Sequence, residues 1–190
     1  MIKFLVEYFW LGPLILCFLY ISGEWFSVTC ARMRRQQNTI EYEGNFELNA
    51  FSQNDTDNLK RFRPRFLIYL LGVLIIFWFL CIPDQKNLYL FVAGLLILHQ
   101  LMINMIHTRN WFFYRYAFGS DGINGHLFYP RYITWRLSSW ESLTYAIFYL
   151  FLSLFTLQWF FFGGFVSCVF IALRMSKFAQ KPRLNKSSAT

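Results

Sequence analysis

The sequence predicts an all-α integral membrane protein with five transmembrane helices, an N-terminus outside the cell and a C-terminus inside. Of its 190 residues, 56% are hydrophobic and 22% are aromatic, whereas only 15% are charged. A soluble domain has about 25% charged residues. The charges are also clustered, and long uncharged runs separate them, as in chains that cross a membrane several times. We therefore expect one polytopic membrane domain, residues 1–190, with no separate soluble domain.

The first predicted span covers about residues 4–22. Its apolar run is interrupted by Glu7 and by Gly12-Pro13, and no small-residue cleavage motif follows it. We therefore interpret it as a retained helix and not as a cleavable signal peptide. Proline has no backbone N–H, so Gly12-Pro13 should kink or open this helix and free carbonyls nearby.

The next spans are predicted at about residues 66–82 and 88–107, and the last apolar run, Leu143–Leu173, must supply two more. It contains 31 residues, which would form a helix about 46 Å long. A hydrocarbon core is only about 30 Å thick. A hairpin fits better, with a turn near Thr156-Leu157-Gln158-Trp159 and spans at about 142–157 and 159–175.

The distribution of basic residues sets the orientation. Five spans place residues 23–65, 108–141 and the tail 176–190 on one side of the membrane. Basic residues gather on the inner side of plasma-membrane proteins, and this accounts for the net charge of +8 better than nucleic-acid binding does. Four spans would put the basic tail outside. The inner side would hold sixteen of the 18 basic residues, all except Lys3 and Lys86: Arg32, Arg34, Arg35, Lys60, Arg61, Arg63, Arg65, Arg109, Arg115, Arg131, Arg136, Arg174, Lys177, Lys181, Arg183 and Lys186.

The two long cytoplasmic segments predict a small β element. In the first, residues 39–48 alternate between apolar and polar; in the second, Ser120-Asp121-Gly122 and Asn124-Gly125 are turn signals. Strand-forming residues flank these turns at 112–116, 127–129 and 132–135. They predict a β-hairpin. A lone hairpin is marginal in water, so the two loops could pair into one small sheet.

Two parts of the chain resemble each other. Each has a strand-like segment, residues 40–48 or 122–129, followed by a membrane hairpin. An offset of 70 residues aligns the second helices and matches Gly94 with Gly164. Either this is a true repeat, with its units related by an axis along the membrane normal, or two Phe-rich helices match by chance.

The third span carries a polar stripe formed by Gln100, Asn104 and His107. Their i, i+4, i+7 spacing places them on one helical face, while His99 lies on a different face. Such side chains either hydrogen-bond to a neighbouring helix or line a pathway for ions, protons or a small solute. Whether the stripe faces protein or water separates these two hypotheses.

Other candidate residues have simpler roles. Glu7 is an intramembrane acid that either reaches the outer surface or faces the bundle as a cation or proton ligand. Gly94, Gly163 and Gly164 favour close helix packing. Basic residues beside span ends predict contacts with anionic lipid headgroups on the cytoplasmic side. These residues are Arg61, Arg63, Arg65, Arg109, Arg174 and Lys177.

No residue set points to catalysis, a metal or a cofactor. The cysteines, Cys17, Cys30, Cys81 and Cys168, have no metal-ligand spacing, and we expect no disulfide. The sequence favours a non-enzymatic assembly or interaction subunit, either a homo-oligomer or bound to another membrane protein. One alternative is a small channel or transporter that uses the polar stripe. A further alternative is a lipid-headgroup enzyme built from the two inner loops.

Overall fold

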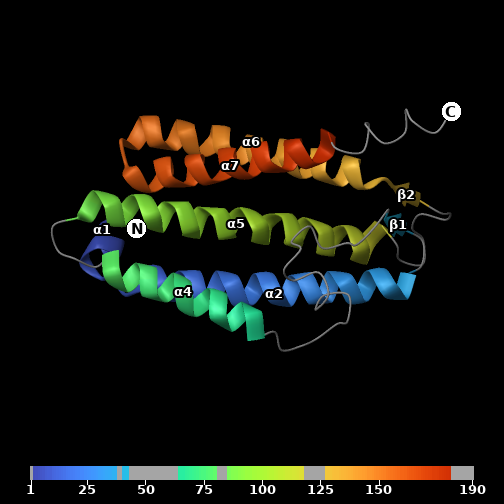
Figure 1. Ribbon diagram of the computed structural model, residues 1–190, viewed down its shortest axis with the longest axis horizontal. Helices are drawn as coiled ribbons and strands as arrows, with labels where there is room; N and C mark the ends of the chain where they lie inside the picture. Colours follow the sequence, from blue (N-terminus) through green and yellow to red (C-terminus); the bar gives the residue numbers. More distant parts are fainter. Residues whose placement is uncertain (1, 38–39, 43–63, 81–84, 118–126, 181–190) are drawn as a thin grey trace.

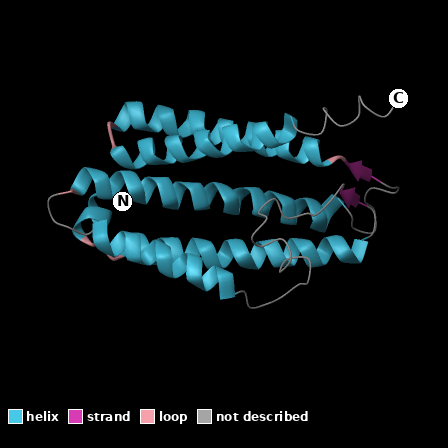
Figure 2. Cartoon of the chain, viewed as in Figure 1, coloured by secondary structure: helices cyan, strands magenta, loops and turns pink. Residues whose placement is uncertain are grey.

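The computed structural model describes residues 2–37, 40–42, 64–80, 85–117 and 127–180, and this part of the chain is almost entirely helical (Figure 2). The exceptions are connecting residues and two strands of three residues each. In chain order the elements are α1 (Ile2–Glu7), α2 (Leu11–Gln37), β1 (Ile40–Tyr42), α4 (Pro64–Leu80), α5 (Lys86–Ala117), β2 (Leu127–Tyr129), α6 (Arg131–Thr156) and α7 (Trp159–Gln180).

The five long helices lie side by side, and each runs opposite to the one before it (Figure 1). Helix α5 lies in the middle, with the α6–α7 hairpin on one side and α2 with α4 on the other. Helices α2, α5 and α7 therefore point the same way. The two strands lie at one end of the bundle, and the α6–α7 turn lies at the opposite end.

Three helical segments are long and apolar enough to cross a membrane: Leu11–Met33, Lys86–Tyr116 and Trp159–Gln180. Five membrane spans were predicted, but only these three of the described helices have the length and composition of a span. Helix α4 has only 17 residues. Helix α6 has 26, but Arg131, Arg136 and Glu141 lie in its first half and lower its hydropathy.

The first predicted span has the wrong bounds. The helix breaks between Glu7 and Leu11, and α2 then continues to Gln37, well past the predicted end at residue 22. Pro13 cannot donate to the carbonyl of Phe9, four residues earlier. The hydroxyl of Tyr89 in α5 donates to that carbonyl instead, at 2.8 Å. The expectation that Gly12-Pro13 frees a carbonyl is thus confirmed, whereas the predicted end at residue 22 is wrong.

The predicted β-hairpin is also wrong within the described residues. Residues 112–116 lie in α5 and residues 132–135 lie in α6, so two of the three predicted strand segments are helical. The third, residues 127–129, is strand β2, and it pairs in parallel with β1 from the first predicted loop, with Ile40 opposite Leu127. The predicted turns at 120–122 and 124–125 lie outside the described residues. Helices α5 and α6 therefore include polar and aromatic residues beyond the predicted spans at 88–107 and 142–157.

The predicted turn between the last two helices is confirmed. Helix α6 ends at Thr156 and α7 begins at Trp159. Leu157 adopts the left-handed conformation, with φ 51°, and its N–H donates to the carbonyl of Ser153 at 2.7 Å. This backbone bond caps α6 and reverses the chain.

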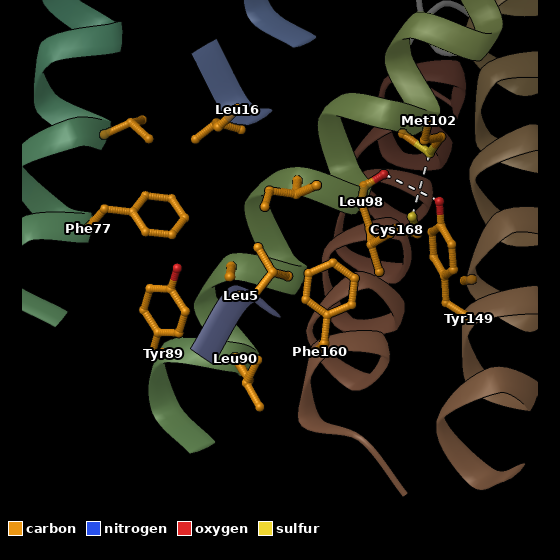
Figure 3. Close-up of a cluster of buried hydrophobic side chains, with 14 residues drawn as sticks. Leu5, Leu16, Phe77, Tyr89, Leu90, Leu98, Met102, Tyr149, Phe160 and Cys168 are labelled. Atoms are coloured by element: carbon orange, nitrogen blue, oxygen red, sulfur yellow. Dashed lines mark hydrogen bonds between the residues drawn. The ribbon is translucent and has the colours of Figure 1, made fainter. Parts of the chain in front are cut away.

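The core lies around α5, and part of it packs α5 against the α6–α7 hairpin (Figure 3). The thiol of Cys168 donates to the sulfur of Met102 at 3.6 Å, and the Tyr149 hydroxyl donates to the carbonyl of Leu98 at 3.5 Å. Both bonds link α5 to the hairpin and leave no polar atom of Tyr149 or Cys168 facing lipid.

Candidate functional site

The polar stripe of α5 faces α2. The side chains of Gln100 and Asn104 are buried, with 5% and 7% exposure. The Nδ2 of Asn104 donates to the carbonyl of Leu19 at 2.8 Å and to the carbonyl of Gln100 at 2.9 Å, and its Oδ1 accepts from the Ser22 hydroxyl at 2.9 Å. The nitrogen and the oxygen of this amide thus both have hydrogen-bond partners within the protein.

Helix α2 supplies a matching polar surface that the sequence analysis missed. The Nε2 of Gln100 lies 3.5 Å from the Leu19 carbonyl. A Cβ added at Gly23 would lie 2.8 Å from the same nitrogen, so a side chain here would have to displace this amide. Ser22 and Gly23 were interpreted as the end of a span. Two small residues in an otherwise apolar run were the available signal for a close, polar helix contact.

The inner part of the stripe continues along α2. His107 is half-buried, and its backbone carbonyl accepts from the thiol of the buried Cys30 at 3.8 Å. His99 lies away from this face, as predicted, and its Nδ1 is buried without a hydrogen-bond partner among the described residues. The structure therefore separates the two histidines.

The three predicted packing glycines meet at one helix crossing, between α5 and α7. A Cβ at Gly94 would overlap the carbonyl of Phe160, and a Cβ at Gly163 would overlap the carbonyl of Phe91. A Cβ at Gly164 would collide with the side chain of Leu98. The first two contacts are reciprocal: each glycine lies against the carbonyl of the residue three positions before the other glycine.

The other predicted site residues are scattered. Glu7 is exposed at the end of α1, outside the helix that is long enough to cross a membrane. Arg109 forms an ion pair with Glu141 of α6. The Arg174 guanidinium lies over the Phe178 ring, 5.8 Å from its centroid, and Lys177 is exposed. Arg61 and Arg63 lie outside the described residues, and Arg65 lies in the first turn of α4.

A second polar stripe, on α6, was not predicted. Thr134, Ser138, Glu141 and Tyr145 share one face at i, i+4, i+7, i+11 spacing. The first three lie in a segment predicted to be a cytoplasmic loop, and their spacing is polar periodicity only if that segment is a helix. The Arg109–Glu141 pair attaches this stripe to α5.

Charge is unevenly distributed along the bundle. Arg32, Arg109, Arg136 and Arg174 all lie in the halves of their helices nearer the strand end, whereas Lys86 begins α5 at the opposite end (Figure 1). The basic residues of helices far apart in the sequence are therefore gathered at one end.

The described residues contain no group of three or more His, Cys, Asp or Glu side chains that could hold a metal ion. Cys17, Cys30 and Cys168 are free thiols, and Cys81 lies outside the described residues. Comparisons with protein-family models, with curated proteins and with solved structures find no match to this chain.

Proposed function

We propose that this protein is a five-span plasma-membrane protein, N-terminus outside and C-terminus inside, that acts as a non-enzymatic assembly subunit. Its partner is either a second copy or another membrane protein. The three helices that are long and apolar enough to cross all run in the same direction. The chain must therefore return across the membrane twice, and α4 and α6 lie antiparallel to these helices in the places where a return is needed.

The lengths of the two returning helices support this arrangement. The 17 residues of α4 span about 26 Å, at the short end of the range for a transmembrane helix. The 26 residues of α6 span about 39 Å, so its apolar half can lie in the hydrocarbon layer while its charged start reaches the inner surface. The single basic end of the bundle supports the orientation.

Gln100 and Asn104 hydrogen-bond to α2, so the polar stripe joins two helices of one molecule and is not available to a partner. The observation that carries an assembly role is the exposed apolar face of α4. This face includes Ile68, Leu71 and Ile75 beside Gly72, which has no atom within 4 Å of an added Cβ. Such a glycine lets another helix approach closely.

Native mass spectrometry of the protein released from lipid nanodiscs tests this function. We expect a dimer or higher oligomer, or a stable complex with a co-purified membrane protein. Gly72→Phe should weaken self-association at least tenfold, because its side chain would separate the helices, whereas Phe18→Leu on the exposed face of α2 should not. A monomer that captures no partner would refute the assembly role.

The transport alternative makes the opposite prediction for the stripe. If α2 moved away from α5, Gln100 and Asn104 would line the space between them. Flux across proteoliposomes that is abolished by Asn104→Leu, in a variant that still folds, would favour a transporter over an assembly subunit.

A further inference from the structure

The polar stripe of α6 supplies one member of a pair of opposite charges, which joins it to α5 and is partly exposed at the outside of the bundle. Arg109 and Glu141 form an ion pair, and their side chains are 56% and 23% exposed. The guanidinium also donates to Oδ1 of Asn110, from Nε at 3.3 Å and from Nη2 at 2.8 Å. Arginine has five N–H donors, so some remain available to a ligand beside this pair.

The carboxylate of Glu141 is only half satisfied. Its Oε1 contacts Arg109, but its Oε2 is buried and has no hydrogen-bond partner among the described residues. The hydroxyl of Thr134, two turns away on the same face, is buried and unpartnered in the same way. Buried polar atoms in folded proteins nearly always have partners. A carboxylate oxygen can only accept, so the Glu141 carboxylate has fewer donors than such a group normally has, whereas the Thr134 hydroxyl could donate or accept.

The ion pair lies at the basic end of the bundle. Glu141 lies fifteen residues before the end of α6 and Arg174 fifteen residues after the start of α7, so both are about 22 Å from the turn that joins these helices. In the proposed membrane arrangement, on which this step rests, that level is the inner part of the bilayer, close to the lipid headgroups.

We propose that the Arg109–Glu141 pair binds the headgroup of a zwitterionic phospholipid with a primary ammonium group, such as phosphatidylethanolamine. The phosphate accepts hydrogen bonds from the remaining guanidinium N–H groups of Arg109. The ammonium donates to the exposed edge of the Glu141 carboxylate, whose side chain is 23% exposed beside Arg109.

The charges and donors of the pair determine this choice of lipid. An anionic headgroup would suit Arg109 alone, as the sequence predicted, but the adjacent carboxylate of Glu141 repels it. A choline headgroup has the same net charge as an ethanolamine headgroup but has no N–H to donate. The site should therefore distinguish an ammonium with hydrogens from one without.

Lipid competition in the unmodified protein tests the proposal without any substitution. The full chain is placed in nanodiscs of phosphatidylethanolamine, phosphatidylcholine and phosphatidylglycerol with identical acyl chains, and native mass spectrometry counts the retained lipids. We expect phosphatidylethanolamine to be retained at least fivefold over phosphatidylcholine. The N-monomethyl and N,N-dimethyl lipids should be retained to intermediate extents, because each methyl group replaces one donor. Equal retention of the ethanolamine and choline lipids would overturn the proposal.

Three variants assign the selectivity to the site. Glu141→Gln and Arg109→Gln should each reduce the preference for phosphatidylethanolamine to less than twofold. Arg174→Gln removes an equivalent charge at the same level and should leave the preference unchanged. If phosphatidylglycerol binds best, and only Arg109→Gln weakens it, Arg109 is a simple anion contact and the proposal fails. These nanodiscs are symmetric, so an error in the proposed orientation or in the assembly role would leave the lipid result unaffected.

Discussion

At the scale of single residues, polar side chains hydrogen-bond to backbone carbonyls in helix α2 and just before it. Pro13 leaves the carbonyl of Phe9 without its helical donor, and Tyr89 supplies a hydroxyl in its place. Further along α2, Asn104 and Ser22 form a small hydrogen-bonded group around the Leu19 carbonyl. In a bilayer these groups have no water to bond, so each unsatisfied one is costly.

Tyr89→Phe removes the hydroxyl and should lower the free energy of unfolding by about 1 kcal/mol, because the Phe9 carbonyl then has no donor. Unfolding of the protein in bicelles measures the change. Tyr116→Phe is the control, since Tyr116 is 68% exposed. Equal effects of the two substitutions would show that the bond to Phe9 contributes nothing.

Asn104→Leu keeps a side chain of similar size and should destabilise the protein by about 1–2 kcal/mol, near the upper end for polar contacts between membrane helices. Combining it with Ser22→Ala in a double-mutant cycle isolates their shared bond. A coupling energy close to zero would mean that the two side chains do not interact in the bilayer.

At the scale of helices, two backbone features determine how the second half of the molecule packs. The carbonyl of Phe160 fills the space where Gly94 lacks a side chain, and the carbonyl of Phe91 does the same at Gly163. The helices α5 and α7 can therefore approach backbone to backbone. At the end of α6, Leu157 adopts the left-handed conformation, which residues other than Gly, Asn and Asp rarely adopt.

Gly94→Ala and Gly163→Ala should each destabilise the protein by several kcal/mol, because the new methyl group overlaps a backbone carbonyl that cannot move alone. Gly72→Ala is the matched control, with unfolding measured on the monomer so that the proposed contact of α4 with a partner does not contribute. Its methyl group meets nothing within 4 Å, and alanine favours a helix over glycine by about 1 kcal/mol. If Gly94→Ala were as harmless as Gly72→Ala, α5 and α7 would not be in close contact.

Leu157→Gly should stabilise the protein by up to about 1 kcal/mol, since glycine adopts the left-handed conformation without strain. Leu157 is 83% exposed, so little packing is lost. The free energy of unfolding measures the gain. Leu154→Gly, also exposed but inside the α6 helix, should instead be destabilising.

At the scale of the whole molecule, the distribution of charge and the direction of the helices both favour the proposed orientation. The helices alternate in direction, and the basic residues of α2, α5, α6 and α7 gather at the strand end. Strands β1 and β2 join the segments that follow α2 and α5 at this end. Both halves of the chain therefore meet on what we propose is the cytoplasmic side.

Fusions to the C-terminus test this topology. Green fluorescent protein fused there should fluoresce, and alkaline phosphatase should be inactive, because the first folds inside the cell and the second outside. A membrane-impermeant maleimide should label Gln158→Cys from outside in a variant without the four natural cysteines. Labelling of residue 158 only after the membrane is opened would refute the N-out, C-in arrangement.

The sequence alone determined the features that depend on local composition. The apolar runs indicated where the long helices lie, three of which are long and apolar enough to cross a membrane. The excess length of residues 143–173 required the turn at 157–158, and the spacing of Gln100, Asn104 and His107 placed them on one face. Helix ends were predicted less well. Gly23 and Glu24 look like a helix end in isolation, but α2 continues through them.

Only the tertiary structure decided which groups satisfy these polar residues. The partner of Asn104 is a backbone carbonyl and a serine some eighty positions earlier, and the partner of Glu141 is an arginine on another helix. Such pairings depend on how helices are placed against each other, and no local pattern encodes that placement. The polar stripe could therefore be read from the sequence, whereas the finding that it faces α2 and not water required the packed bundle.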